Sequence, residues 1–124
     1  SFWEKATILH TEYHRPAGKP IPDRFARHYS DFAALWRHPA RAAALQRLDL
    51  LEQVAIFKSR FFASSWAQYE TARAGRLKLA PAPEREGELR RDYVKMEPMF
   101  LKSPLPFIQV VEALVEAERE INAR

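Results

Sequence analysis

The sequence contains no cysteine and only three glycines among its 124 residues. Without cysteine the chain has no disulfide, thiolate zinc ligand or thiol nucleophile, which excludes zinc fingers and cysteine enzymes. Gly18, Gly75 and Gly87 are far apart, so the sequence has no glycine-rich phosphate loop and no dinucleotide-binding fingerprint. Any nucleotide chemistry would therefore need residues supplied from elsewhere.

Long hydrophobic runs are also missing. No apolar segment is long enough to cross a bilayer, and the N-terminus lacks the basic, apolar and small-residue zones of a signal peptide. We therefore expect no membrane association and a cytoplasmic location. Because Ser1 is not methionine and directly precedes a helical pattern, we also expect the chain to begin partway through a larger protein.

The residues that are present suit one folded domain. Hydrophobic residues make up 47% of the chain and aromatic residues 12%, which is enough for a real core. The formal charge of +4 permits a polyanionic partner but does not require one. The apolar periodicity predicts an all-α fold: a single helical domain of about five to seven helices, with a short extended segment around residues 76–83.

Residues 24–36, with the sequence RFARHYSDFAALW, are the most informative segment. Apolar side chains at helical spacing share one face: Phe25, Tyr29, Phe32 and Trp36. Polar side chains lie beside that face: Arg24, Arg27, His28 and Asp31. We expect Asp23 to cap this helix and Pro39 to end it. Arg27 and Asp31 are four residues apart, so a solvated ion pair is one explanation of the polar edge and a functional site is another.

The first helix is expected from Ser1, as its cap, to about His14, with Phe2, Ala6, Leu9 and Tyr13 buried. Lys5 lies at the margin of this stripe. It either packs its aliphatic stem on the core or acts as a cation that binds phosphate. The proline-rich connection of residues 15–22 is short, which makes the first two helices neighbours that can place Lys5 and Asp31 around a common opening.

Two histidines on the first helix, His10 and His14, are four residues apart. They could share a metal ion, but the sequence between them lacks the glutamate of an HExxH motif. The alternative is a polar surface face. A histidine-based metal hydrolase is therefore the weakest of the functional hypotheses.

Further helices are expected over residues 40–48, over residues 49–63 with Asp49 as cap, and over residues 65–74, ended by Gly75. The second of these has an apolar stripe: Leu51, Val54, Ala55, Phe61 and Phe62. Lys58 interrupts that stripe, so its ammonium must reach solvent, meet a carboxylate or line a cavity.

Two helices complete the predicted chain. One should run through residues 84–100, with Met96 and Met99 as core filler. The last opens at Ser103 and Pro104 or Pro106, with an apolar stripe inside: Phe107, Val110, Val111, Leu114 and Ile121. Its glutamates are predicted to form a solvated outer face: Glu112, Glu116, Glu118 and Glu120.

Several phrases in this order resemble the C-terminal half of the AbiEii/AbiGii nucleotidyltransferase toxins of bacterial abortive-infection toxin–antitoxin pairs. They are FWEKATILH (residues 2–10), RHYSDFAAL (27–35), SRFF with a later Trp and Tyr (59–69), GRLKLAP, RRDYVKMEPMF and EREIN. Members of this family resemble DNA polymerase beta-type enzymes, with a GS motif and a D-x-D magnesium-binding pair in an N-terminal lobe. Neither motif occurs here, so residues 1–124 would be the helical C-terminal lobe alone.

The resemblance implies roles for individual residues. Lys5 matches the family lysine and would hold the triphosphate, and Asp31 matches the family aspartate, with Arg27 as the motif arginine. We take Lys5 and Asp31 as candidate catalytic residues, and Lys5, Arg27, His28 and Lys58 as candidate substrate-binding residues. Residues 30–32 have the sequence SDF, whereas YDL is expected in close relatives; the difference retains the aspartate, Asp31. No metal ligands are assigned within the chain, and Mg²⁺ is expected only in the full-length enzyme.

The expected partners are a nucleoside triphosphate, an RNA acceptor such as the 3′ end of tRNA, and a separately encoded antitoxin. The basic residues are compatible with an RNA-backbone surface or with solubility alone: Arg24, Arg37, Arg41, Arg47, Arg73, Arg76, Lys78, Arg90 and Arg91. The main alternative to an enzyme lobe is a non-catalytic helical module that binds RNA or another partner.

Overall fold

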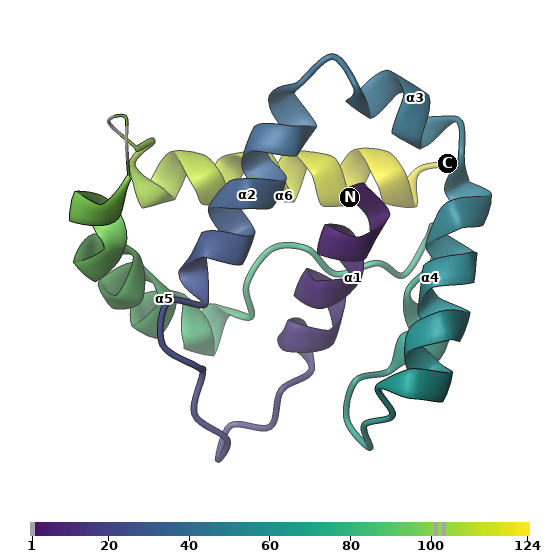
Figure 1. Cartoon of the computed structure of the whole chain (residues 1–124), viewed down its shortest axis with the longest axis horizontal. Coiled ribbons are helices and arrows are strands. Elements are labelled where there is room, and N and C mark those ends of the chain that lie inside the picture. Colours follow the sequence, from purple (N-terminus) through teal and green to yellow (C-terminus); the bar gives the residue numbers. More distant parts are fainter. Residues whose placement is uncertain (1, 101, 103) are drawn as a thin grey trace.

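The computed structural model describes residues 2–100, 102 and 104–124, and the regular structure of this part is entirely helical (Figure 1). The α-helices are α1 (Phe2–Tyr13), α2 (Ala26–Arg37), α3 (Arg41–Leu45), α4 (Leu48–Phe61), α5 (Pro83–Met96) and α6 (Phe107–Asn122). Two single 3₁₀ turns, η1 (Tyr69–Thr71) and η2 (Glu97–Met99), complete the regular structure of the described residues. The predicted all-α single domain is confirmed. No described helix is both long and apolar enough to span a bilayer.

Helix α2 is the centre of the fold, because α1, α3, α5 and α6 all pack against it. Figure 1 shows α2 crossing in front of α6, with α1 beside it. The predicted apolar face is buried: Tyr29, Phe32 and Trp36 are each at most 3% exposed. Burying side chains of this size is the largest favourable contribution to folding, roughly 2 to 3 kcal/mol each.

The start of α2 differs from the prediction. Asp23 does not cap it; instead, the carboxylate of Asp92 on α5 accepts hydrogen bonds from the backbone N–H groups of Arg24 (2.9 Å) and Ala26 (2.8 Å). Arg24 has a φ of 64°, an unusual conformation for a residue with a side chain. The end of α2 is as predicted, since His38, which precedes Pro39, is extended.

The cap predicted for α4 is also wrong. The helix begins at Leu48, so Asp49 lies inside its first turn, where it pairs with Arg47 at 3.0 Å. The expected helix over residues 65–74 is reduced to η1, although Gly75 does have the predicted left-handed conformation. The caps proposed at Ser1 and Ser103 lie outside the described residues.

The segment predicted to be extended, around residues 76–83, forms no strand: residue 76 belongs to a turn, residue 80 to a bend, and residue 83 begins α5. Side chains rather than a neighbouring strand satisfy its backbone. Asn122 Oδ1 accepts from the Gly75 and Leu77 N–H groups, and Glu118 Oε1 accepts from Leu79 N–H at 2.7 Å. Leu77 and Leu79 themselves are fully buried. The last helix therefore does not present a uniformly solvated row of glutamates. Glu116 is engaged as well, because it accepts a hydrogen bond from the Trp36 indole at 3.2 Å.

Three side chains predicted to be buried are exposed instead. Phe61 and Phe62, at the end of α4, are 67% and 61% exposed, and Met99 is 58% exposed. The stripe of α4 is narrower than its sequence suggests, because Leu51 and Ala55 are the buried residues of this helix.

Candidate functional site

The structure brings Lys5 and Asp31 together. Lys5 Nζ on α1 lies 3.3 Å from Asp31 Oδ2 on α2, and both side chains are partly exposed, at 31% and 40%. Packing between the helices explains the contact, because the rings of Phe2, about one turn before Lys5, and Phe32, next to Asp31, lie 5.0 Å apart. An ion pair this accessible adds at most about 1 kcal/mol to stability, so stability alone is a weak reason for it.

His28 lies one helical turn before Asp31 and is half-buried. Burial lowers its pKa, and the nearby Lys5 ammonium lowers it further, whereas Asp31 acts in the opposite direction. Its Nδ1 atom is buried and has no hydrogen-bond partner in the described part of the chain. The ring packs on Phe25, with the ring centres 4.6 Å apart.

Lys58 on α4 is the second cation of this region. Its side chain is half-buried, and burial lowers its pKa; the Glu4 carboxylate opposes this shift, and Lys5 adds to it. The ammonium of Lys58 therefore lies within electrostatic reach of both α1 residues. We call Lys5, His28, Asp31 and Lys58 the Lys5–Asp31 site.

Arg27 is exposed at the edge of this site. Among the described residues Asp31 forms its ion pair with Lys5, not with Arg27, so the ion pair considered from the four-residue spacing is not formed. Arg27 still contributes to the electrostatics, because its charge helps to lower the pKa of His28.

The polar surface face proposed for His10 and His14 is wrong for His10, which is fully buried. Its Nδ1 accepts a hydrogen bond from Lys78 N–H at 3.0 Å, so the ring proton is on Nε2, which donates to Thr71 Oγ1 at 2.9 Å. Both ring nitrogens therefore form hydrogen bonds that hold residues 71 and 78 against α1. Burial also lowers the pKa of His10 to about 4. This structural role removes the basis for a metal hydrolase built on the two histidines.

Two pockets lie elsewhere on the described surface. One of about 650 Å³ is formed by α4 and residues 63–74, and another of about 380 Å³ lies between residues 21–24 and α5. Neither is lined by Lys5 or Asp31. The contact between the two side chains is partly open to solvent, since they are 31% and 40% exposed.

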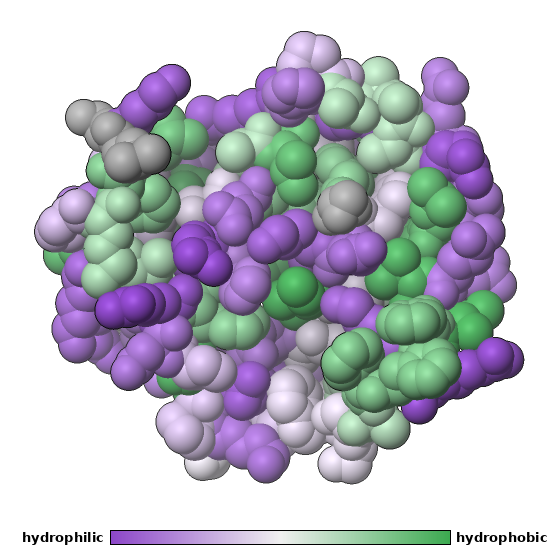
Figure 2. All heavy atoms as spheres, viewed as in Figure 1, coloured by the Kyte–Doolittle hydropathy of each residue, from purple (hydrophilic) through white to green (hydrophobic). Residues whose placement is uncertain are grey.

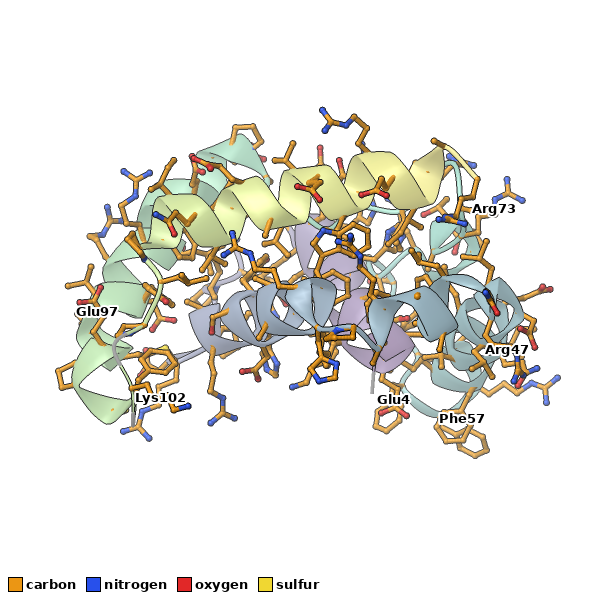
Figure 3. All side chains as sticks on the ribbon, turned by 90° about the horizontal axis from the view of Figure 1, so that it is seen from above. Glu4, Arg47, Phe57, Arg73, Glu97 and Lys102 are labelled. Carbon is orange, nitrogen blue, oxygen red and sulfur yellow. The ribbon has the colours of Figure 1, made fainter. Side chains whose placement is uncertain are left out.

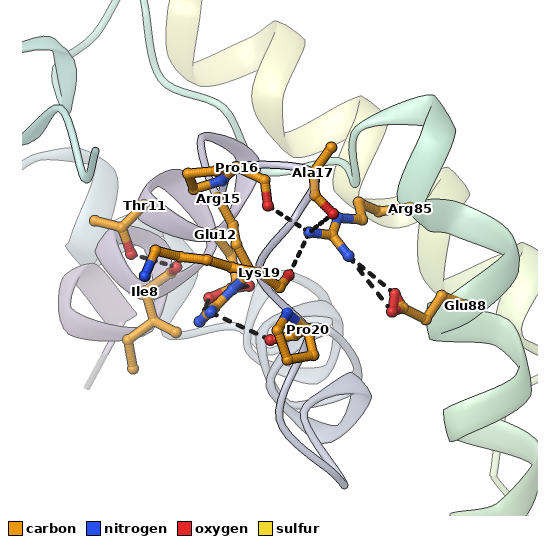
Figure 4. Close-up of polar contacts among 10 residues, drawn as sticks. All are labelled: Ile8, Thr11, Glu12, Arg15, Pro16, Ala17, Lys19, Pro20, Arg85 and Glu88. Atoms are coloured by element: carbon orange, nitrogen blue, oxygen red, sulfur yellow. Dashed lines mark hydrogen bonds and ion pairs between the residues drawn. The ribbon is translucent and has the colours of Figure 1, made fainter. Parts of the chain in front are cut away.

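A further group of contacts anchors the connection between α1 and α2 to α5 (Figure 4). The Arg85 guanidinium on α5 donates to the backbone carbonyls of Pro16 and Lys19 and pairs with Glu88 at 3.1 Å. Arg15 forms a bidentate ion pair with Glu12 at the end of α1. These contacts fix the proline-rich connection, and with it the positions of α1 and α2.

The described residues do not suit a metal site, since they contain no group of three or more histidine, aspartate or glutamate side chains placed to hold an ion. Asp31 is a single carboxylate that already contacts an ammonium. Glu4 was missed in the sequence, although its position beside Lys5 on one helix was a signal that it would affect the charge of the region.

Fold and site together define a helical domain with a lysine–aspartate pair at the junction of its first two helices. The sequence model of the nucleotidyl transferase AbiEii toxin family, a type IV toxin–antitoxin system, matches residues 1–117, and the chain belongs to this family. The predicted resemblance is confirmed, and membership implies a cognate antitoxin. No curated protein and no solved structure matches the chain.

Proposed function

We propose that this chain is the helical C-terminal lobe of a toxin that transfers a nucleotide from a nucleoside triphosphate to an RNA acceptor such as tRNA. The observation that carries the proposal is the contact between Lys5 and Asp31 across α1 and α2. An ammonium and a carboxylate that meet at a partly exposed contact suit a reaction that joins a polyphosphate to a hydroxyl group, because a substrate can reach both groups.

In this proposal Lys5 and Lys58 bind the phosphate oxygens as point cations, and Arg27 and His28 contact the substrate at the edge. Asp31 orients the acceptor hydroxyl, whose oxygen attacks the α-phosphorus. The new P–O bond forms as the bond to pyrophosphate breaks, and the hydroxyl proton is released. Catalysis of this kind depends mainly on positioning and charge neutralisation.

The chain would be inactive alone, because its sequence contains neither a GS motif nor a D-x-D pair. We propose that Mg²⁺ is bound by a carboxylate pair on a separate N-terminal lobe, where it would neutralise phosphate charge. The described residues of this chain contain no group of three or more side chains placed to hold a metal ion. The proposal therefore predicts both motifs upstream of Ser1 in the parent polypeptide.

Single substitutions in the full-length polypeptide test the proposal. Lys5→Ala and Asp31→Ala should each abolish nucleotide transfer to RNA while leaving thermal unfolding nearly unchanged. The matched control is the exposed Arg47 and Asp49 ion pair, and Arg47→Ala and Asp49→Ala should leave transfer unaffected. Transfer that survives Lys5→Ala or Asp31→Ala would show that the assigned role is wrong.

A non-catalytic RNA-binding module is the second candidate. The exposed phenylalanines beside basic residues at the end of α4 favour it. It predicts a parent polypeptide without the GS and D-x-D motifs, and RNA affinity that falls steeply as salt increases.

A further inference from the structure

Three phenylalanine side chains form an exposed cluster at the end of α4. Phe57, Phe61 and Phe62 are 54%, 67% and 61% exposed. The Phe57 ring centre lies 4.7 Å from that of Phe61 and 6.4 Å from that of Phe62. Figure 2 shows the hydrophobic surface that gathers over this end of α4, at the lower right of the view. We call these three residues the aromatic patch.

Cations interleave with the patch along the helix. Lys58 and Arg60 alternate with the phenylalanines in the sequence FKSRFF, and Arg60 is exposed. Lys58 lies within electrostatic reach of Lys5, which connects the patch to the Lys5–Asp31 site. Figure 3 shows Phe57 on α4 and Glu4 on α1 on the same side of the molecule. One surface therefore combines open aromatic rings with ammonium and guanidinium groups.

We propose that the aromatic patch is a stacking platform for unpaired bases of a single-stranded RNA, the acceptor of the proposed reaction. Proteins that bind single strands combine aromatic rings, on which bases stack, with cations that follow the phosphates. The Phe57 and Phe61 rings are inclined at 36°, so they do not cover each other face to face. An apolar protein partner would leave the exposed Arg60 without complementary charge, whereas RNA provides both base faces and phosphates.

One part of this inference rests on the proposed function: that the bound strand is the acceptor and that its 3′ end lies beside Lys5 and Asp31. The platform itself depends only on the side chains of α4. It can therefore be tested by binding, without a transfer reaction.

The binding test compares two labelled probes by fluorescence anisotropy: a short oligoadenylate and an abasic ribose-phosphate strand of the same length. A Phe57→Leu, Phe61→Leu double variant keeps apolar surface but loses the rings. We expect it to bind oligoadenylate at least about tenfold more weakly than the wild-type chain and to bind the abasic strand equally well. The controls Ile108→Ala and Val115→Ala, at exposed apolar positions of α6, should change neither affinity.

Equal oligoadenylate affinities of the wild-type chain and the leucine variant would overturn the platform. A Phe61→Trp variant gives a second readout in the full-length polypeptide. If bases stack on the patch, the added indole should be exposed in the free protein, so that iodide quenches its emission. Binding of oligoadenylate should then quench the same emission. An added emission already shielded from iodide would mean that another lobe or a second copy covers the patch, and it would also overturn the platform.

The two proposals can fail separately. If Lys5→Ala abolishes transfer while the leucine variant binds oligoadenylate normally, the platform is wrong and the enzymatic role stands. If the leucine variant loses binding while Lys5→Ala retains transfer, the platform is supported and the role of Lys5 is wrong.

Discussion

The imidazole of His10 on α1 accepts a hydrogen bond from the backbone N–H of Lys78, with 3.0 Å between the two nitrogens. This bond ties the first helix to the extended segment 68 residues later. It requires a neutral ring, because a protonated imidazole has no acceptor nitrogen. The contact therefore makes the fold sensitive to acid.

The first prediction concerns pH. Burial lowers the pKa of His10 from 6.5 to about 4; the hydrogen bond to the Gln68 carbonyl and the charge of Glu70 oppose this shift, and His14 and Lys78 add to it. Between these values the unfolded chain binds a proton that the folded chain does not, so stability is lost as the pH falls. We expect a loss of roughly 3 kcal/mol at most across this window, measured by urea unfolding. A His10→Gln chain should show a flatter dependence between pH 6.5 and 5, and an unchanged slope would contradict this account.

The second prediction concerns the start of α2. Asp92→Ala removes the acceptor of the Arg24 and Ala26 N–H groups and should lower the free energy of unfolding by about 1 to 2 kcal/mol. Asp23→Ala is the matched control, because this exposed residue was the cap expected from the sequence; it should cost less than about 0.5 kcal/mol. The reverse order of the two effects would mean that Asp23 is the cap.

The third prediction concerns the extended segment. Glu118→Ala leaves the buried Leu79 N–H without its acceptor, so this amide and that of Ala80 should exchange with deuterium faster. Nuclear magnetic resonance of the exchanging amides gives the measurement. Glu112→Ala, at an exposed position of the same helix, should leave both rates unchanged. Equal acceleration by the two variants would show that Glu118 does not hold the segment.

The sequence predicted the parts of the fold that depend on local pattern. The buried face of α2 follows from helical spacing, and the end of α2 follows from Pro39. The short connection of residues 15–22 also made α1 and α2 neighbours, which places Lys5 near Asp31. The chemical role assigned to that pair stays a prediction.

Contacts between residues distant in the chain could not be predicted in the same way. Asp92 caps a helix 66 residues earlier, and His10 reaches Lys78 across a similar separation. Helical spacing alone also predicted, wrongly, that Phe61 and Phe62 are buried. Periodicity shows which side chains share a face, but not whether another segment packs over that face. The expected helix over residues 65–74 is instead a loop with one short turn, so it does not cover these rings.

The most direct test of the central claim is an exchange of the two charges in the full-length polypeptide. Lys5→Asp combined with Asp31→Lys keeps opposite charges at this contact, and such a pair changes stability by about 1 kcal/mol at most. If Lys5 binds phosphate and Asp31 orients the acceptor hydroxyl, the double variant should fold normally and transfer no nucleotide. Recovery of transfer in the double variant, after loss in each single variant, would show that the pair is only structural and would contradict the account.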